Sequence, residues 1–400
     1  MEAETDRLDT ALRHCRVSFP LIDVTESVER ESMRNAYGCI YFIYGPSCSN
    51  GRARKPYCGR TGLRRAPPLQ TMPLRSLHVQ HCTYPIRGVF RISRGSKTQA
   101  DAVILRITED GYTGRGECIP YGHYGESVAS VIAQIEAIAP MIRDGMDVDR
   151  LQSVLPAGAA RNAVDCALWD LRSRMSGVSV SAYAGLPGPL APVQTAFTIS
   201  LDSPATMAVH AYAHRHMPML KLKLGGEGDD ERVLAVRSSA PSARLIADAN
   251  ESWAPEHLER YLPLFASLGL ELLEQPLPAG ADDFLSTFKS PVPLAADESC
   301  RDANSIPAIL GKYSIANIKL DKSGGLTEAL RVARGAREAG LGIMVGCMVG
   351  SSLSMAPGIV LAQCADFVHL DGPLLLESDI TPALPIDGAT LSPDAAVWAV

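Results

Sequence analysis

The sequence lacks several features that would place a protein in a class at once. Among its 400 residues no apolar run reaches the roughly 18 residues that a membrane-spanning helix needs. Its first ten residues, MEAETDRLDT, are polar and acidic and differ from a secretory signal peptide. The formal net charge of −6 argues against a nucleic-acid-binding surface. We therefore expect a cytoplasmic protein that has neither nucleic acid nor membrane as a partner.

The ten cysteines form no CxxC or CxxH pattern. This absence gives no support to a zinc module or to a framework of disulfides, both of which need regularly spaced cysteines. We expect the cysteines to be reduced thiols, as in a cytosolic protein.

Residues 1–71 differ in composition from the rest of the chain. They contain 11 Lys and Arg residues against 8 Asp and Glu residues, so the acidic excess lies entirely in the remainder. Between residues 46 and 66, six basic residues and no acidic residue are mixed with Gly, Pro and Ser, which is typical of an unfolded linker. A tail that binds nucleic acid or an anionic surface is the functional alternative. We expect a poorly ordered extension, or a natural start at Met72.

Residues 72–185 carry strand patterns followed by helix patterns. Strand-like stretches at 77–84, 102–108 and 114–119, with turns at Arg94-Gly95 and Asp110-Gly111, predict an antiparallel meander. Apolar spacing then predicts helices over 127–142 and 159–175. Together these patterns indicate a small α+β capping domain ahead of a larger one.

Residues 186–380 show a regular repeat. Short apolar runs recur every 22 to 27 residues, and most gaps between them have a helical pattern, as at 256–268 and 326–339. One residue marks each run: Phe197, Lys223, Asp248, Glu274, Asp297, Lys319, Gly346 and Asp371. Eight such units predict an α/β protein with a (β/α)8 barrel. An open doubly wound sheet is the alternative, but no glycine fingerprint follows the first strand. Residues 381–400 are expected to return to the capping domain.

The stretch MLKLKLGG places two lysines on one face of a strand. Lys221 and Lys223 alternate with leucines, and side chains two apart on a strand point the same way. The leucines and the following Gly-Gly predict a buried strand that ends in a tight turn. Like charge and desolvation are expected to lower the pKa of such a lysine, which would allow it to act as a base.

Three consecutive predicted strands end in Asp248, Glu274 and Asp297. A single carboxylate at a strand end is most often a helix N-cap. Three that converge would repel one another, whereas three oxygen ligands at the end of a barrel where active sites lie suit Mg²⁺. We expect one Mg²⁺ per subunit at this position, with Lys223 and Lys319 approaching it from opposite sides.

These residues predict proton transfer at a carbon next to a carboxylate. The metal would bind that carboxylate and stabilise an enediolate, while one lysine removes the proton. Return of a proton from the other lysine would invert the centre, whereas loss of a β substituent would give an alkene. A Schiff-base aldolase could also use a barrel lysine, but it would not need three carboxylates.

The motifs KLKLGG, DAN, LEQP, ADES, NIKLDKSGGL, VGCMVGSSL and HLDGPLLL resemble, in order and spacing, those of the enolase superfamily, in its muconate-lactonizing-enzyme-like subgroup. The likeness is greatest to dipeptide epimerases that act on L-Ala-D/L-Glu, and it extends over residues 76–379. It implies a Mg²⁺-dependent, homo-oligomeric isomerase of murein peptide metabolism. By resemblance Asp248, Glu274 and Asp297 bind the metal, and Lys223 and Lys319 are the acid/base pair.

The resemblance also implies which residues surround the substrate. Lys221 would lie beside the substrate carboxylate, and Thr198, in FTIS, would touch the dipeptide. Arg94 or Lys97, in the loop RGSK, would pair with an acidic second residue, as an L-Glu side chain requires. A solvated turn is the alternative for this loop. Asp321, which follows Lys319 in the same motif, is more simply a turn cap.

The eighth strand departs from the resemblance. Dipeptide epimerases usually carry Asp-x-Asp there to hold the ammonium group of the dipeptide, but this chain has His369-Leu370-Asp371. A neutral imidazole offers no salt bridge, so we expect ammonium binding to be weaker or reorganised. The alternatives are N-acylamino-acid racemase, o-succinylbenzoate synthase or cycloisomerase chemistry. A non-catalytic barrel that binds a metal and an acidic ligand is a further alternative, although it would not need two opposed bases.

Overall fold

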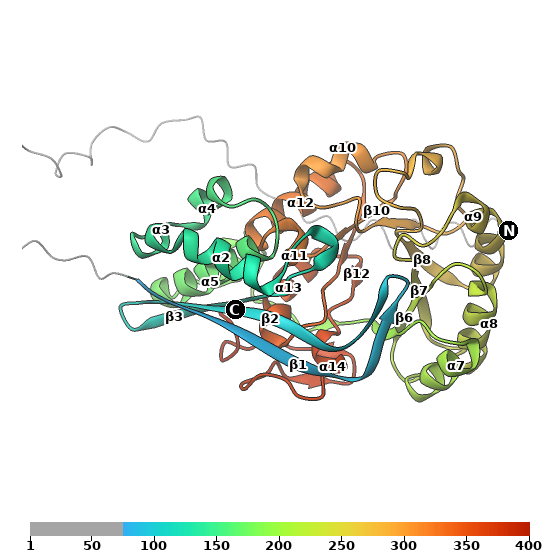
Figure 1. Ribbon diagram of the computed structural model, residues 1–400, viewed down its shortest axis with the longest axis horizontal. Coiled ribbons are helices and arrows are strands. Elements are labelled where there is room, and N and C mark those ends of the chain that lie inside the picture. Colours follow the sequence, from blue (N-terminus) through green and yellow to red (C-terminus); the bar gives the residue numbers. More distant parts are fainter. Residues whose placement is uncertain (1–74) are drawn as a thin grey trace, which may run out of the picture. The chain divides into compact units, whose positions relative to one another are not determined.

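The computed structural model describes residues 75–400 (Figure 1). The extension predicted for residues 1–71 and its linker at 46–66 lie outside the described residues. Within residues 75–400, no helix has the length and apolar character needed to cross a membrane.

The first described elements are three antiparallel strands in the order β1-β2-β3. They are β1 (Ser76–Ile92), β2 (Gly95–Glu109) and β3 (Tyr112–Cys118). The predicted meander and both of its turns are confirmed, but β1 and β2 are longer than the sequence indicated. Their pairing continues to the turn at Ser93 and Arg94, and the tip of this long hairpin reaches the barrel (Figure 1).

A group of helices packs on this sheet: α2 (Val128–Ala137), α3 (Ala139–Arg143), α4 (Val148–Val154), α5 (Ala159–Ser176) and α6 (Val180–Tyr183). The helix expected at 159–175 is α5. The helix expected at 127–142 is divided at Ile138, because Pro140 lies in the first turn of α3 and has no N–H to continue α2.

The remaining chain forms an eight-stranded parallel sheet whose strands follow one another in sequence order. They are β5 (Phe197–Ile199), β6 (Met219–Lys223), β7 (Arg244–Asp248), β8 (Leu270–Glu274), β9 (Leu294–Ala296), β10 (Ile315–Ile318), β11 (Gly342–Val345) and β12 (Phe367–Val368). The N–H of Ala196 donates to the carbonyl oxygen of Val368 at 2.9 Å, which joins the first strand to the last. The predicted barrel is confirmed, and each of the eight marker residues lies in a strand or within three residues of its end.

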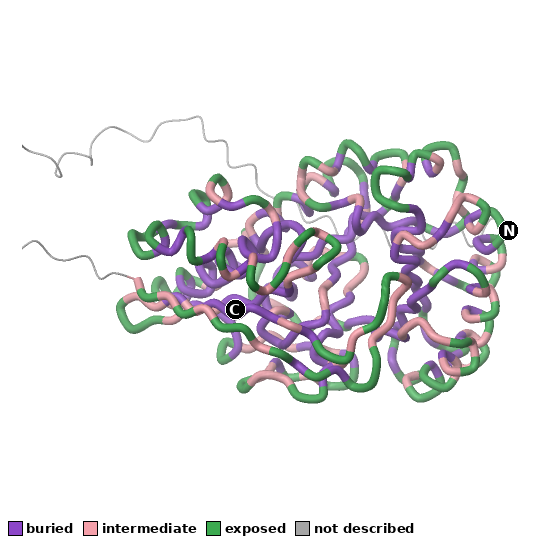
Figure 2. The backbone as a smooth tube through the Cα atoms, viewed as in Figure 1, coloured by how far each residue is buried: buried purple, intermediate pink, exposed green. Residues whose placement is uncertain are grey.

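The outer layer of the barrel is made mainly by α7 (Pro204–Ala213), α8 (Asp229–Ser239), α9 (Pro255–Ser267), α12 (Leu326–Glu338) and α13 (Ser352–Ala362). The helices predicted at 256–268 and 326–339 are α9 and α12. The strand–helix repeat is incomplete between β8 and β9, where the described chain forms a short 3₁₀ helix, η2 (Asp283–Ser286), and no α-helix. Figure 2 shows the strands buried and the outer turns of the helices exposed, as expected for a barrel with one core inside its helical layer.

Shorter elements complete the fold: η1 (Gly122–Tyr124), η3 (Ala303–Ser305), α10 (Ile306–Ile309), α11 (Leu320–Ser323), α14 (Gly372–Leu375), and a small antiparallel sheet of β4 (Val193–Gln194), β13 (Ile386–Asp387) and β14 (Thr390–Leu391). The final residues contact α5 and β3. Trp398 Nε1 donates to the carbonyl oxygens of Arg115 and Cys166, and the N–H of Ala399 donates to Asp170.

Candidate active site

The three predicted metal ligands come together at the C-terminal end of the barrel. Asp248 and Glu274 are the last residues of β7 and β8 and are paired in the strand ladder, and Asp297 directly follows β9. All three are fully or almost fully buried, and each offers a carboxylate oxygen within 4.8 Å of the others. The arrangement arises because parallel neighbouring strands end at the same edge of the sheet.

The two predicted acid/base lysines flank these carboxylates. Lys223 Nζ lies 2.6 Å from Asp248 Oδ2, and Lys319 Nζ lies 2.6 Å from Asp297 Oδ2. Lys223 ends β6 and Lys319 follows β10, and these strands are four apart in a closed ring of eight. The two ammonium groups therefore approach the space above Glu274 from opposite sides of the barrel.

The lowered pKa expected for a lysine on the strand of Lys221 and Lys223 is wrong for Lys221, and the pKa of Lys319, for which no shift was predicted, is also raised. Burial does oppose the charge of both lysines, but neighbouring carboxylates outweigh it and raise both pKa values. Glu274, whose Oε2 lies 2.5 Å from Lys221 Nζ, is the main cause for Lys221, and Asp297 is the main cause for Lys319. The sequence argument considered the two lysines of one strand and did not include the carboxylates on neighbouring strands.

The carboxylate trio fits a hard divalent cation. Three buried carboxylates supply oxygen ligands only, which is the donor set that Mg²⁺ prefers. Two further buried oxygens next to the trio, Asn250 Oδ1 and Glu298 Oε2, have no hydrogen-bond partner. Burial, together with the charges of Asp297 and Asp248, raises the pKa of Glu298 to about 8. Asn250 Oδ1 and Glu298 Oε2 therefore remain without a hydrogen-bond partner beside the trio, whose own carboxylates pair with lysines.

A cavity of about 240 Å³ opens above this site. Its lining includes most of the predicted site residues: Arg94, Lys97, Thr198, Lys223, Asp297, Lys319, His369 and Asp371. The other three, Lys221, Asp248 and Glu274, are fully buried beneath it and contact the lining residues. The structure therefore brings every predicted site residue to one place.

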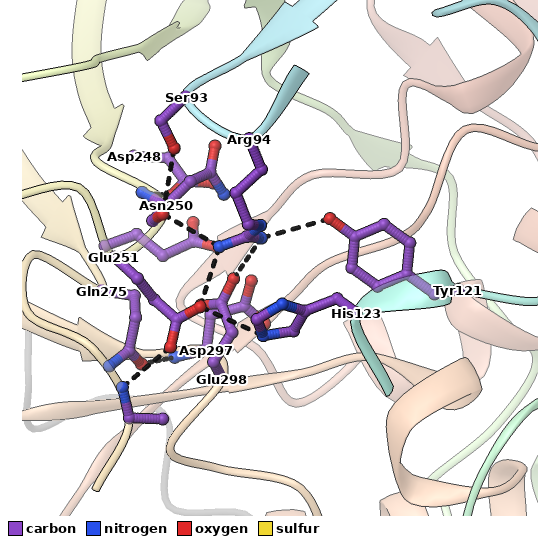
Figure 3. A network of polar contacts seen from close by, with 12 residues as sticks. Ser93, Arg94, Tyr121, His123, Asp248, Asn250, Glu251, Gln275, Asp297 and Glu298 are labelled. Atoms are coloured by element: carbon purple, nitrogen blue, oxygen red, sulfur yellow. Dashed lines mark hydrogen bonds and ion pairs between the residues drawn. The ribbon is translucent and has the colours of Figure 1, made fainter. Parts of the chain in front are cut away.

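Arg94, one of the two residues predicted to pair with an acidic substrate side chain, is already paired with two protein carboxylates. Its guanidinium donates to Glu298 at 2.6 Å, to Glu251 at 2.9 Å, to the carbonyl oxygen of Asn250 at 2.9 Å and to the hydroxyl of Tyr121 at 3.2 Å (Figure 3). Because two protein carboxylates already neutralise it, Arg94 fastens the tip of the β1–β2 hairpin to the loops after β7 and β9.

Lys97 is the candidate that stays available for a substrate carboxylate. It lines the cavity, and within residues 75–400 its ammonium group makes no ion pair with a protein carboxylate. Its ammonium group lies over the ring of Phe90, 5.8 Å from the ring centroid. Burial lowers the pKa of Lys97, and an anionic ligand would favour its charged form.

Several residues at the site were given no role in binding or catalysis from the sequence. Glu298 lies within the motif ADES and Glu251 directly follows the motif DAN, and this position was the available signal. His123 pairs with Glu251 at 3.1 Å (Figure 3). Tyr124 lines the cavity. Lys322 donates to Asp297 Oδ1 at 2.6 Å, as well as to three backbone oxygens, and so fixes that ligand from below.

The strand-eight residues form a closed polar group with Thr198. His369 Nε2 lies 2.8 Å from Thr198 Oγ1 and 3.0 Å from Asp371 Oδ1, and its Nδ1 lies 3.3 Å from Lys221 Nζ. The N–H of Thr198 donates to Asp371 Oδ2 at 2.8 Å. Burial, with Lys221 nearby, lowers the pKa of His369 to about 4 even though Asp371 acts against this.

Comparison with known families divides the described chain into two matching regions. Residues 75–185 match the mandelate racemase / muconate lactonizing enzyme N-terminal domain, and residues 205–390 match the enolase C-terminal domain-like family.

Individual relatives match over most of their length. The L-Ala-D/L-Glu epimerase of Escherichia coli (strain K12) is 44% identical over 313 residues, which cover 78% of this chain and 97% of that protein. The N-acetyl-D-glutamate racemase of Pseudoalteromonas sp. is 42% identical over 279 residues, which cover 69% of this chain and 88% of that protein.

Two solved structures show the same fold. An enolase family member from Agrobacterium tumefaciens with homology to dipeptide epimerases, with bound sodium and L-Ala-L-Glu, has a TM-score of 0.80 and 46% identity, covering 81% of this chain and 100% of that one. The dipeptide epimerase of Enterococcus faecalis V583, complexed with Mg and the dipeptide L-Leu-L-Tyr, has a TM-score of 0.76 and 28% identity, covering 82% and 99%.

Proposed function

Because this chain belongs to the mandelate racemase / muconate lactonizing enzyme family of the enolase superfamily and is an isomerase of amino-acid derivatives, we propose that it epimerises the glutamate α-carbon of a dipeptide such as L-Ala-D/L-Glu. The observation that carries the proposal is the opposition of Lys223 and Lys319 across the cavity. Inversion of a carbon needs one group that takes a proton from one face and another that delivers a proton to the other face.

Each lysine is suited to either half of this exchange. As an ammonium group it donates a proton to the α-carbon, and after transfer of that proton the neutral amine accepts one from the next substrate of the opposite configuration. The carboxylates of Asp248 and Asp297, each 2.6 Å from one lysine, hold the two Nζ atoms in place. The cavity keeps both lysines largely away from solvent, which limits loss of the proton to bulk water.

Asp248, Glu274 and Asp297 would hold one Mg²⁺. Bound there, Mg²⁺ would supply the positive charge that favours loss of a proton from a carbon next to a carboxylate. The E. faecalis protein complexed with Mg and a dipeptide supports this assignment, as does the all-oxygen donor set.

Lys97 supports a substrate with an acidic side chain. It is a cavity-lining cation without a protein carboxylate as its ion-pair partner in the described chain, and a glutamate side chain would supply that partner. The name of the E. coli relative and the L-Ala-L-Glu bound to the A. tumefaciens protein point to the same side chain.

Racemisation of an N-acylated glutamate is the second candidate. It requires the same chemistry at the same carbon, and it is the activity in the name of the Pseudoalteromonas relative. The observation that favours it is His369, a cavity-lining side chain whose lowered pKa of about 4 keeps it uncharged near neutral pH.

The test of the two-lysine proposal is hydrogen exchange in single variants. In D₂O with Mg²⁺, Lys223→Ala and Lys319→Ala should each lose net epimerisation by about 1,000-fold or more, because proton transfer on one face is removed. Each variant should still exchange the α-proton of one pure epimer, and the two variants should exchange opposite epimers. ¹H NMR of the α-proton measures both quantities.

Lys289→Ala is the matched control, because Lys289 is exposed and lies outside the cavity lining. It should behave like the unchanged protein. If both active-site variants exchanged the same epimer, or if either retained full epimerisation, the two-base proposal would be wrong.

A further inference from the structure

We propose that the hydrogen-bond donors behind the carboxylate trio select a small divalent cation, Mg²⁺, against a larger one, Ca²⁺, and that Asn317 and Lys322 are the positioning residues for this selection. The inference rests on the metal site of the proposed function and extends it to the size of the cation. One shared feature carries it: each carboxylate has one oxygen held by a donor of the protein and one oxygen within ion-pair distance of Lys221, Lys223 or Lys319.

Glu274 is held by a side-chain amide. Its Oε1 accepts a hydrogen bond from Asn317 Nδ2 at 2.7 Å, and its Oε2 lies 2.5 Å from Lys221 Nζ. Asn317 lies on β10, two strands away from Glu274, and is completely buried. The opposite orientation of the amide would place two acceptor oxygens against each other, so the nitrogen must face Glu274. One oxygen of this carboxylate is therefore already in use.

Asp297 is held by an ammonium group. Its Oδ1 accepts a hydrogen bond from Lys322 Nζ at 2.6 Å, and its Oδ2 lies 2.6 Å from Lys319 Nζ. Lys322, on α11, is 1% exposed and also donates to the backbone oxygens of Asp297, Cys300 and Asn317. Since an ammonium group has three donors, these acceptors use all of them and hold Nζ in one position. Asp297 Oδ1 is therefore also in use.

Asp248 is held by the backbone. Its Oδ1 accepts the N–H of Asn250 at 2.8 Å, while its Oδ2 lies 2.6 Å from Lys223 Nζ and 3.4 Å from Lys221 Nζ. Three different kinds of donor, an amide side chain, an ammonium group and a backbone N–H, thus leave the same result at three strand ends. Each carboxylate has one oxygen turned to the protein behind it and one to the centre of the site.

This arrangement limits each carboxylate to a single bond to a cation. Mg²⁺ takes about six oxygens and keeps several waters, so three single carboxylate oxygens leave it positions for water and for a substrate carboxylate. Ca²⁺ takes roughly six to eight oxygens and often binds both oxygens of one carboxylate. The oxygens held by the protein therefore deny Ca²⁺ ligands that it would otherwise gain, whereas Mg²⁺ loses nothing.

The test measures the affinities for the two cations and not turnover. Isothermal titration of the full-length protein with MgCl₂ and with CaCl₂ gives both Kd values, and Mg²⁺ should bind about tenfold more tightly or better. Asn317→Leu keeps the shape of the side chain and removes its donor, so both oxygens of Glu274 can reach the cation. The ratio of the Ca²⁺ Kd to the Mg²⁺ Kd should then fall about tenfold or more. Lys322→Met should lower the ratio in the same direction through Asp297.

Asn162→Leu is the matched control, because it removes another buried amide that donates to a carboxylate, Asp321, at 2.8 Å and outside the trio. Its ratio should stay within about threefold of the unchanged protein. Titration compares two Kd values within each variant, so partial loss of folded protein does not affect the ratio.

An unchanged ratio in Asn317→Leu or in Lys322→Met would overturn the inference and leave the metal site of the proposed function standing. Tighter binding of Ca²⁺ than of Mg²⁺ by the unchanged protein would overturn it in the same way. Absence of Mg²⁺ binding by the unchanged protein would refute the metal site itself, and the inference with it.

Discussion

Glu274 lies at the centre of the candidate site, and one neighbouring residue balances its charge while another fixes its orientation. Its Oε2 lies 2.5 Å from Lys221 Nζ, and its Oε1 accepts a hydrogen bond from Asn317 Nδ2 at 2.7 Å. Asn317 therefore orients the carboxylate, while Lys221 balances its charge. Desolvation of Glu274 raises its pKa, and so do the charges of Asp248 and Asp297, whereas Lys221 acts against them.

Replacement of Glu274 by Gln should separate metal binding from folding. The change keeps the shape of the side chain and removes its charge, so Mg²⁺ should bind about 100-fold more weakly or worse, with loss of epimerisation. Isothermal titration calorimetry measures the affinity, and circular dichroism should show an unchanged fold. Glu271→Gln is the control, because Glu271 lies on the same strand and pairs outside the site with Arg244. Mg²⁺ affinity equal to that of the control, or full activity in EDTA, would contradict the assignment.

The sequence predicted which residues form the site better than it predicted their pKa values and their interaction partners. The carboxylates and lysines could be found because each lies at a strand end within a short motif. The engagement of Arg94 could not be found, because its partner Glu298 is 204 residues away in the chain. The raised pKa values of Lys221 and Lys319 depend in the same way on carboxylates of other strands.

Among the elements, β3 and α5 make a contact that only glycine permits. A Cβ atom on Gly116 would lie 2.1 Å from the carbonyl oxygen of Ala163, and one on Gly114 would lie 2.1 Å from that of Ala167. The strand therefore lies directly on the backbone of the helix. This contact holds β3, the strand that leads into the loop of His123 and Tyr124, and this loop reaches the site.

Substitution of Gly116 by Ala should destabilise the protein by about 3 kcal/mol, because backbone atoms on both sides must move apart. Urea unfolding followed by tryptophan fluorescence measures the change. Gly122→Ala is the control, since a Cβ at Gly122 would meet no atom within 4 Å. Equal stability of the two variants would show that β3 and α5 can separate at little cost.

The sequence predicted the boundaries of a helix correctly where a single apolar stripe runs along the whole helix. The helices α5, α9 and α12 were predicted within one or two residues, because each has a continuous apolar stripe. The division between α2 and α3 was missed, since the stripe continues across Pro140. The 3₁₀ turn between β8 and β9 was also missed, because strand spacing alone does not show what fills a gap.

At the scale of the whole described chain, Glu117 joins the two domains. It ends β3 with its neighbour Cys118, and its Oε1 accepts the N–H of Ser351 at 2.8 Å, just before α13. Its Oε2 accepts hydrogen bonds from the hydroxyls of Ser351 and Tyr84. Burial raises the pKa of Glu117 to about 7, although the hydrogen bonds from Ser351 act against this.

This pKa predicts how stability depends on pH. The folded state holds the Glu117 proton more tightly than the unfolded state, so stability is gained as pH falls through about 7 and lost as pH rises through that value. Glu117→Gln mimics the protonated acid. Between pH 5 and pH 8 the free energy of unfolding of this variant should therefore fall by about 2 to 3 kcal/mol less than that of the unchanged protein.

Urea unfolding of the variant at four pH values between 5 and 8 measures this difference. Glu136→Gln, on the exposed face of α2, is the control and should follow the unchanged protein. Parallel pH profiles for the Glu117 variant and the unchanged protein would show that Glu117 does not change its ionisation in this range.

The two sides of the site resemble each other across β8. On one side Lys223 pairs with Asp248, on the other Lys319 pairs with Asp297, both at 2.6 Å, and Glu274 lies between the pairs. Substrate and product of the proposed reaction are themselves mirror images at one carbon. An enzyme built in this way has no preferred direction of its own: in a cell, the direction of net conversion would follow whichever epimer is supplied and whichever is removed.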